Sequence, residues 1–152
     1  MQNRISAVQN IVDKYISESK DAKKFYIHSY GVAGISALLA VKRKLSQDVA
    51  SAAGLLHDIY AIKEGTYDNH ADLGSKMARE ILLETCLFSD NEIAAVCRAI
   101  YQHDNHTEIG DDYDEVLKDA DILEPFFRTL TKPDFPRVDE KLKRIFKELS
   151  IE

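Results

Sequence analysis

The sequence is poor in cysteine and in the two residues that most often interrupt regular structure. Its 152 residues include 6 glycines, 3 prolines and 2 cysteines, and all the prolines follow residue 124. The two cysteines, Cys86 and Cys97, are too few for a disulfide scaffold, so reduced thiols are the simpler interpretation. Because glycine and proline are sparse over most of the chain, long helices are favoured.

The chain also lacks a long hydrophobic run and an excess of positive charge. The longest mostly apolar stretch, residues 31–41, is well short of the roughly 20 residues that a membrane-spanning helix requires. The first residues contain no apolar core typical of a signal peptide. With 20 Lys+Arg against 26 Asp+Glu, the net charge is −6, which argues against a protein that coats nucleic acid. We therefore expect a cytoplasmic protein whose partners are neither membranes nor nucleic acids.

The composition that is present, 45% hydrophobic and 30% charged, is that of an ordinary globular domain. No stretch alternates apolar and polar residues as a strand does. We therefore predict an all-α fold, a single-domain bundle of about six to seven helices over residues 1–152. The expected helices cover about 3–18, 22–45, 47–58, 70–86, 90–103, 113–130 and 137–150, with loops at 59–69 and 104–112. The last helix is expected to pack back on the bundle with a partly basic, solvated face.

Four histidines occupy positions where an apolar helix face meets, or approaches, a helix end. His28 lies on the apolar stripe of the helix 22–45, and His57 ends the next predicted helix with Asp58 beside it. His70 opens the helix 70–86, and His103 closes the helix 90–103. A single inward histidine is usually a core residue with one satisfied hydrogen bond, but four such positions are harder to explain separately. The fifth histidine, His106, receives no role from the sequence.

Two carboxylates, Asp119 and Asp121, fall inside an otherwise apolar late helix and require a partner, because burying an unpaired charge is costly. Neutral imidazole and carboxylate are natural ligands of Mn, Fe, Zn or Ni, and helical bundles build such sites from facing helices. The helical wheel does not decide between the two aspartates. The H-E-x-x-H and E-x-x-H motifs are both absent, and no Ser-His-Asp or Cys-His arrangement suggests covalent catalysis.

The ordered set His28, His57-Asp58 and Asp121 resembles the metal-binding pattern of the HD-domain superfamily of metal-dependent phosphohydrolases. The surrounding segments are similar too, over about residues 24–125: AAGLLHDI, NHADLG, AIYQH and KDADIL. The resemblance implies that His28, His57, Asp58 and Asp121 hold one metal ion. It also implies that His70 and His103 correspond to the extra histidines of binuclear members, in which the aspartate of the HD pair bridges two ions. The alternative is that these two contact substrate phosphate or line the pocket.

Three further residues receive roles beside that pattern. Lys63 and Lys118 are candidates to contact a substrate phosphate, and Asp119 is a candidate to orient a ligand histidine. Many members of the superfamily continue the HD pair with Gly and Lys, whereas residues 59–63 of this sequence are Ile-Tyr-Ala-Ile-Lys. The Gly-Tyr-Pro signature of cyclic-dinucleotide phosphodiesterases is also missing, which argues against that subclass.

The resulting prediction is a metal-dependent phosphohydrolase that cleaves a phosphate ester or anhydride of a nucleotide or other small phosphorylated metabolite. A metal-activated water would attack phosphorus, with His57 and Asp58 at the centre of catalysis. The cofactor would be one or two divalent transition-metal ions, Mn, Fe, Ni, Co or Zn, with Mg as a further option. Two alternatives stay open. One is a non-catalytic metal- and nucleotide-binding sensor or protein-interaction module of the same fold, and the other is a plain bundle with structural histidines.

Overall fold

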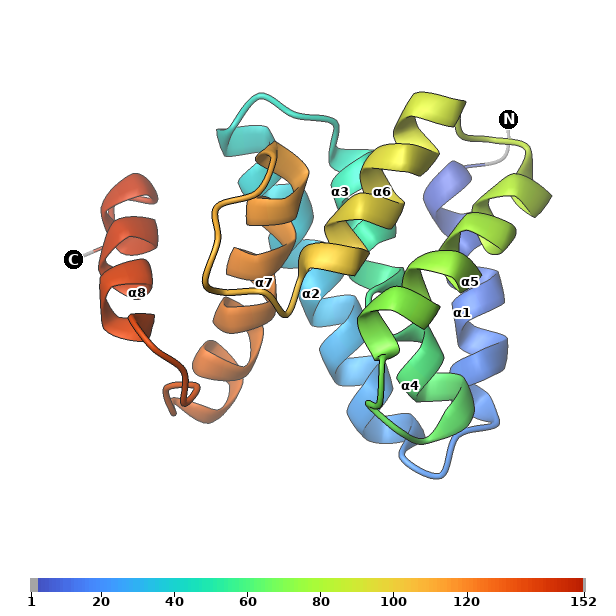
Figure 1. Ribbon diagram of the computed structural model, residues 1–152, viewed down its shortest axis with the longest axis horizontal. Coiled ribbons are helices and arrows are strands. Elements are labelled where there is room, and N and C mark those ends of the chain that lie inside the picture. Colours follow the sequence, from blue (N-terminus) through green and yellow to red (C-terminus); the bar gives the residue numbers. More distant parts are fainter. Residues whose placement is uncertain (1–2, 152) are drawn as a thin grey trace.

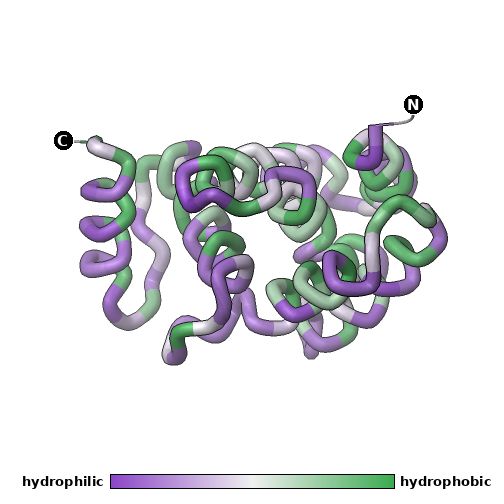
Figure 2. The backbone as a smooth tube through the Cα atoms, turned by 90° about the horizontal axis from the view of Figure 1, so that it is seen from above, coloured by the Kyte–Doolittle hydropathy of each residue, from purple (hydrophilic) through white to green (hydrophobic). Residues whose placement is uncertain are grey.

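The structure, a computed structural model, describes residues 3–151, and within that range every regular element is a helix (Figure 1). The elements are α1 (Arg4–Ser17), α2 (Ala22–Lys42), α3 (Gln47–Leu56), α4 (Ile59–Glu64), α5 (His70–Thr85), α6 (Asp90–Gln102), α7 (Asp112–Thr129) and α8 (Val138–Glu148). The predicted all-α fold class is therefore confirmed. Along the helices, hydrophobic and hydrophilic residues alternate, as amphipathic elements require (Figure 2).

The loop prediction for residues 59–69 is wrong in its first half, which forms the short helix α4. Three apolar side chains of this segment, Ile59, Ala61 and Ile62, are buried against the rest of the bundle. Tertiary burial thus stabilises a helix of six residues that would be marginal in isolation. Gly65 ends it in the left-handed conformation, with φ of 70°, which glycine adopts without steric cost.

The long helix α2 runs through the middle of the bundle and packs against both α3 and α7, while α5 packs against α6. Two glycines permit close approach to α2. A Cβ at Gly54 of α3 would lie 2.6 Å from Ala33 Cα, and a Cβ at Gly31 would lie 2.6 Å from Glu124 Cγ. Because neither Cβ exists, α3 and the Glu124 side chain of α7 reach the α2 backbone directly.

Serine caps fix the starts of the two helices that end in histidine. Ser46 accepts a hydrogen bond from the Val49 amide at the start of α3, and Ser89 forms a capping box with Glu92 at the start of α6. These helices end at the C-cap residues His57 and His103. Fixed helix starts therefore set where both histidines fall.

The last helix, α8, stands beyond α7 at one end of the molecule (Figure 1). It buries Leu142 and Ile145, and the ion pair between Arg43 and Glu148 ties it to the end of α2 at 2.9 Å. A second ion pair joins Arg144 of α8 to Asp119 of α7 at 2.9 Å. Among residues 3–151, no helix has both the length and the apolar character needed to cross a bilayer.

Candidate metal centre

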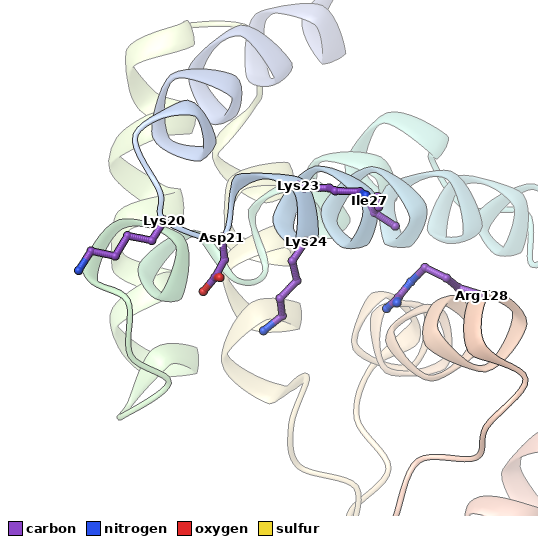
Figure 3. A pocket seen from close by; sticks show the side chains of 6 residues that line it. All are labelled: Lys20, Asp21, Lys23, Lys24, Ile27 and Arg128. Carbon is purple, nitrogen blue, oxygen red and sulfur yellow. The ribbon is translucent and has the colours of Figure 1, made fainter.

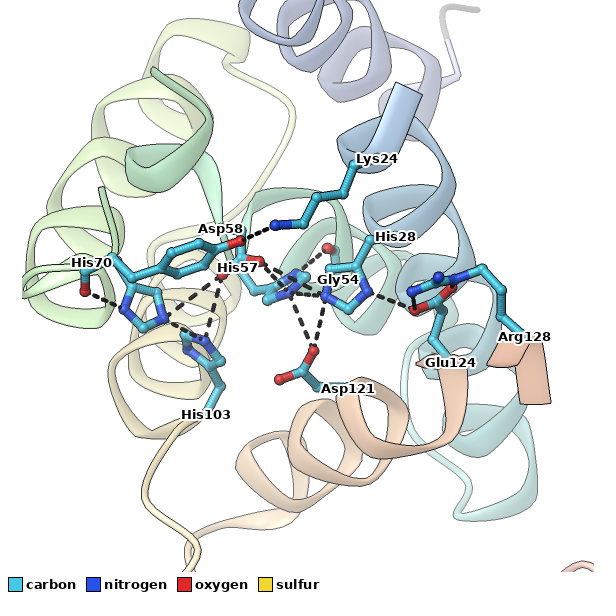
Figure 4. Close-up of polar contacts among 11 residues, drawn as sticks. Lys24, His28, Gly54, His57, Asp58, His70, His103, Asp121, Glu124 and Arg128 are labelled. Atoms are coloured by element: carbon cyan, nitrogen blue, oxygen red, sulfur yellow. Dashed lines mark hydrogen bonds and ion pairs between the residues drawn. The ribbon is translucent and has the colours of Figure 1, made fainter. Parts of the chain in front are cut away.

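Six of the residues singled out in the sequence meet in the middle of the bundle (Figure 4). They come from five separate segments: His28 from α2, His57 and Asp58 from the end of α3, His70 from the start of α5, His103 from the end of α6, and Asp121 from α7. We refer to His28 and His57 as the first pair and to His70 and His103 as the second pair.

Three of the four histidines are oriented by the same local device. In each, ring atom Nδ1 bonds to the carbonyl oxygen three residues earlier: 2.7 Å for His57 to Gly54, 2.8 Å for His70 to Tyr67, and 2.6 Å for His103 to Ile100. A carbonyl oxygen can only accept, so Nδ1 must be the donor and carry the hydrogen. In the neutral ring, Nε2 then offers a lone pair.

His28 is oriented by a carboxylate instead. Its Nδ1 donates to Glu124 Oε2 at 2.6 Å, and Arg128 Nε donates to the other oxygen of Glu124 at 2.6 Å. The role of Glu124 was not inferred from the sequence. One feature could have indicated it, because Glu124 lies three residues after Asp121 and therefore on the same face of α7. A carboxylate behind a ligand histidine fixes the ring and makes its free nitrogen a better donor to metal.

Within each pair, the two free nitrogens point at one another. The Nε2 atoms of His28 and His57 lie 3.2 Å apart, and those of His70 and His103 lie 3.1 Å apart. Two lone pairs at this separation repel unless a cation lies beside both. Ligand atoms about 2.1 Å from an ion in a tetrahedral site are themselves about 3.4 Å apart, close to both separations.

Asp58 lies between the pairs and turns one oxygen to each. Its Oδ2 is 3.3 Å from His57 Nε2 and 3.8 Å from His28 Nε2. Its Oδ1 is 3.7 Å from His70 Nε2 and 3.8 Å from His103 Nε2. Two three-residue clusters with metal-ligand spacing therefore share this single carboxylate.

Asp121 joins the first pair only. Its Oδ1 is 3.0 Å from His28 Nε2 and 3.5 Å from His57 Nε2. The first cluster thus offers four candidate ligands from His28, His57, Asp58 and Asp121, whereas the second offers three. The electrostatics of the two clusters differ accordingly.

The protonation equilibria reflect this difference. Burial alone would lower the pKa of His57, but the Asp58 and Asp121 carboxylates outweigh burial and hold that pKa well above its ordinary value. Burial would raise the pKa of Asp121, but hydrogen bonds to His28 and His57 hold it well below its ordinary value. At His103, burial and the neighbouring His57 lower the pKa. The first pair therefore occupies a site that attracts positive charge.

The cluster is only partly shielded from solvent. The side chains of His57, His103 and Asp58 are almost completely buried, whereas that of Asp121 is 25% exposed. The side chains of His28 and His70 are also partly exposed. Solvent therefore reaches the cluster at these three residues.

Asp119 and Lys118, which received roles from the sequence, contact other residues than those of the cluster. The Asp119 carboxylate is fully buried between Arg43 and Arg144, at 2.6 and 2.9 Å, and so binds arginines rather than orienting a histidine. Lys118 is also fully buried, and its ammonium group donates to Glu115 at 2.8 Å and to a backbone carbonyl. That ammonium group is engaged within the protein instead of facing a substrate.

Lys63 and His106 lie elsewhere on the molecule. Lys63, on α4, is half exposed and its Nζ lies 3.6 Å from Glu64. Its proposed contact with a substrate phosphate stays a prediction. His106, in the segment between α6 and α7, stacks on the Phe135 ring at a centroid distance of 4.3 Å.

Comparison with known proteins places this arrangement in a family. Residues 25–125, which include all six clustered residues, match the HD domain. A crystal structure described as a predicted HD superfamily hydrolase from an uncultured Thermotogales bacterium superposes with a TM-score of 0.68. It is 25% identical and covers 94% of this chain and 85% of its own.

A curated relative is ribonuclease Y from Campylobacter hominis, which is 30% identical over 98 residues. The match covers 64% of this chain but only 17% of the ribonuclease, so the two proteins share one segment and not their full architectures. The HD-domain match spans most of this chain and contains its buried His/Asp cluster. The chain therefore belongs to the HD-domain family.

Proposed function

We propose that this protein is a metal-dependent phosphohydrolase that cleaves an ester or anhydride bond of a small phosphorylated metabolite. The observation that carries the proposal is the convergence of four imidazole nitrogens on Asp58, with the opposite nitrogen of each ring committed to an acceptor. Hydrogen bonds that hold four lone pairs in this orientation, next to two carboxylates, fit cation binding better than a purely structural role. The similar solved structure, described as a hydrolase, supports the same reaction class.

Two divalent ions, one at each pair, fit the donor set. Asp58 has one oxygen for each pair, so a single carboxylate would bridge the two ions. Imidazole-rich sites favour Mn, Fe, Co, Ni or Zn over Mg or Ca. Ions at these sites would supply a hydroxide near neutral pH and polarise the phosphoryl oxygen.

The chain's own residues position this chemistry. His57, His103 and Asp58 are buried, and Glu124 orients the partly exposed His28 by accepting its hydrogen bond. The partly exposed Asp121 lies where water enters. Phosphate hydrolysis forms a bond from water oxygen to phosphorus, breaks the bond from phosphorus to the leaving oxygen, and returns a proton to the leaving group. The substrate would lie at the exposed edge of the cluster, beside Asp121.

A small anion is a more suitable substrate than RNA. The chain carries a net charge of −6, and RNA-binding proteins depend on positive surface to neutralise successive phosphates. At the cluster itself, two divalent ions would offset the charges of Asp58 and Asp121, so one anionic group can approach. The likeness to a ribonuclease segment nevertheless makes a short oligoribonucleotide a necessary comparison in any substrate screen.

The test is a phosphate-release screen in which the purified protein is supplied separately with Mn, Fe, Co, Ni, Zn or Mg. The substrates should include phosphomonoesters, nucleoside mono-, di- and triphosphates, dinucleotide polyphosphates and a short oligoribonucleotide. We expect turnover of at least one small phosphate compound, dependent on added metal and abolished in His57→Ala. Full metal binding without turnover of any of these compounds would contradict the proposal and favour a metal-binding sensor of the same fold.

A further inference from the structure

A basic groove lies beside the candidate metal centre, between the start of α2 and the end of α7 (Figure 3). It encloses about 400 Å³ and is lined by Lys20, Asp21, Lys23, Lys24, Ile27 and Arg128. Four of these six side chains are cationic and one is anionic. Such a groove is suited to an anionic group.

Both walls of this groove connect to His28 of the first pair. Lys24 lies four residues before His28 on α2, which places the two on the same helix face about 6 Å apart along the axis. On the other wall, Arg128 donates to Glu124, which accepts from His28. Lys24 on α2 and Glu124 on α7 therefore connect this groove to His28.

Lys24 also contacts Tyr67, in the segment between α4 and α5. Its ammonium group donates to the Tyr67 hydroxyl at 3.5 Å and lies 5.4 Å from the centre of that ring. The Tyr67 ring in turn packs edge-on against His70 of the second pair, at a centroid distance of 5.2 Å. The Lys24–Tyr67 contact thus links α2, the helix that carries His28, to the residue that packs on His70.

The geometry of the Tyr67 hydroxyl group allows it to donate a hydrogen bond at this position. Because that hydroxyl accepts from Lys24, its own hydrogen is available to a further acceptor. The hydrogen-bond partner of Lys24 is a neutral phenol, so its positive charge is available to an anionic ligand.

We propose that the substrate carries a second phosphate that is not cleaved, and that Lys24, which lines the basic groove, binds it together with Tyr67. This inference rests on the proposed phosphohydrolase function and narrows its substrates to compounds with two or more phosphates. Lys20 and Lys23 extend the same positive surface away from the cluster. Arg128 lines the wall of the groove, but its guanidinium group already donates two hydrogen bonds to Glu124.

The test compares ligands that the enzyme cannot hydrolyse, measured by calorimetry on the metal-loaded protein. Methylphosphonate has one phosphonate, methylenediphosphonate has two, and phosphonoacetate replaces the second by a carboxylate. We expect Lys24→Met to lower the affinity for methylenediphosphonate about tenfold, which corresponds to the loss of one hydrogen bond to a charged group. The affinity for methylphosphonate should not change. Lys24→Arg should restore most of the affinity, and Lys76→Met, which removes an exposed lysine of α5, should have no effect.

The outcomes separate this inference from the function on which it rests. If methylphosphonate fails to bind the metal-loaded protein, the proposed phosphohydrolase site is itself contradicted. A second outcome is that methylphosphonate binds while Lys24→Met lowers the affinity for both phosphonates equally or for neither. In that case the proposal of a second-phosphate site is wrong and the proposed function stands. If phosphonoacetate binds as tightly as methylenediphosphonate, the assignment of the groove to a phosphate is overturned.

Discussion

The two histidine pairs of the cluster are alike in geometry and unlike in electrostatics. Each pair brings two Nε2 atoms to just over 3 Å and faces one oxygen of Asp58. Only the first pair has a second carboxylate, Asp121, and a carboxylate behind one ring, Glu124. The pKa of His57 is raised, whereas that of His103 is lowered mainly by burial. Equal spacing of the two pairs therefore does not imply equal affinity, and we expect the first pair to bind metal more tightly.

The change with the largest expected effect removes the residue that both pairs share. Asp58→Ala should remove the ion at the second pair, where only two histidines remain, and weaken binding of the ion at the first pair. Turnover should fall about a thousandfold or more, because several kcal/mol of transition-state stabilisation depend on the metal. Metal analysis after gel filtration and a phosphate-release assay check this. Asp72→Ala, which removes an exposed aspartate of α5, is the matched control. Retention of both ions by Asp58→Ala would show that the pairs do not depend on a bridge.

Removing one histidine from each pair should separate the two sites. We expect His57→Ala and His103→Ala each to retain one ion per chain. The ion kept by His103→Ala should be the tighter, because it has four candidate ligands and His57→Ala leaves a site with three. Titration with a fluorescent metal competitor measures both affinities. Equal affinities for the remaining ions would contradict the difference between the pairs.

A smaller and more selective effect is expected at Glu124. Glu124→Ala removes the acceptor that fixes His28, and loss of such a partner weakens metal binding about 10- to 100-fold. Only the ion at the first pair should be affected. Glu124→Gln keeps an oxygen acceptor for His28 and should recover part of the affinity. If both ions weaken together, Glu124 supports the fold as a whole and does not act through His28.

The change with the smallest expected effect, Glu92→Gln, is a control for the loss of folding stability alone. Two hydrogen bonds from Arg4 lower the pKa of Glu92 at the start of α6, so this pair stabilises the fold above the ordinary pKa of Glu92. That contribution is lost as pH falls through the folded-state pKa. Glu92→Gln should therefore cost about 1 kcal/mol near neutral pH, with a difference from wild type that shrinks below about pH 5.

Chemical denaturation across this pH range measures the effect of Glu92→Gln. The variant should keep both metal ions, since Glu92 lies at the opposite end of α6 from His103. Loss of either ion in this variant would mean that the metal effects of the other substitutions reflect general unfolding.

Much of the fold and of the cluster could be predicted from the sequence because both depend on local patterns. Apolar spacing placed His28 on the inner face of its helix, and the serine caps lie in the sequence next to the helices they start. The helical wheel could not decide whether Asp119 or Asp121 is the metal ligand, because it does not show which residues of other helices each aspartate faces. Only the packed structure shows Asp119 between two arginines and Asp121 at the first pair.

The features that the sequence did not indicate depend on contacts between distant segments. Glu124 and His28 are 96 residues apart, and their contact depends on the absence of a side chain at Gly31. Lys118 looked available for phosphate binding because a charged residue is usually exposed, but its partners Glu108 and Glu115 enclose it. The helix α4 formed where turn-like residues suggested a loop, because burial of its apolar side chains outweighed local preference.

The most direct test of the central claim is anomalous diffraction from a crystal of the metal-loaded protein, recorded at the absorption edge of the bound metal. We predict two anomalous peaks per chain, one between Asp58 Oδ2 and the first pair and one between Asp58 Oδ1 and the second pair. The first peak should be at least as strong as the second. The absence of any peak beside Asp58 in metal-loaded crystals would contradict the metal centre, and a single peak at one pair would contradict the two-ion arrangement.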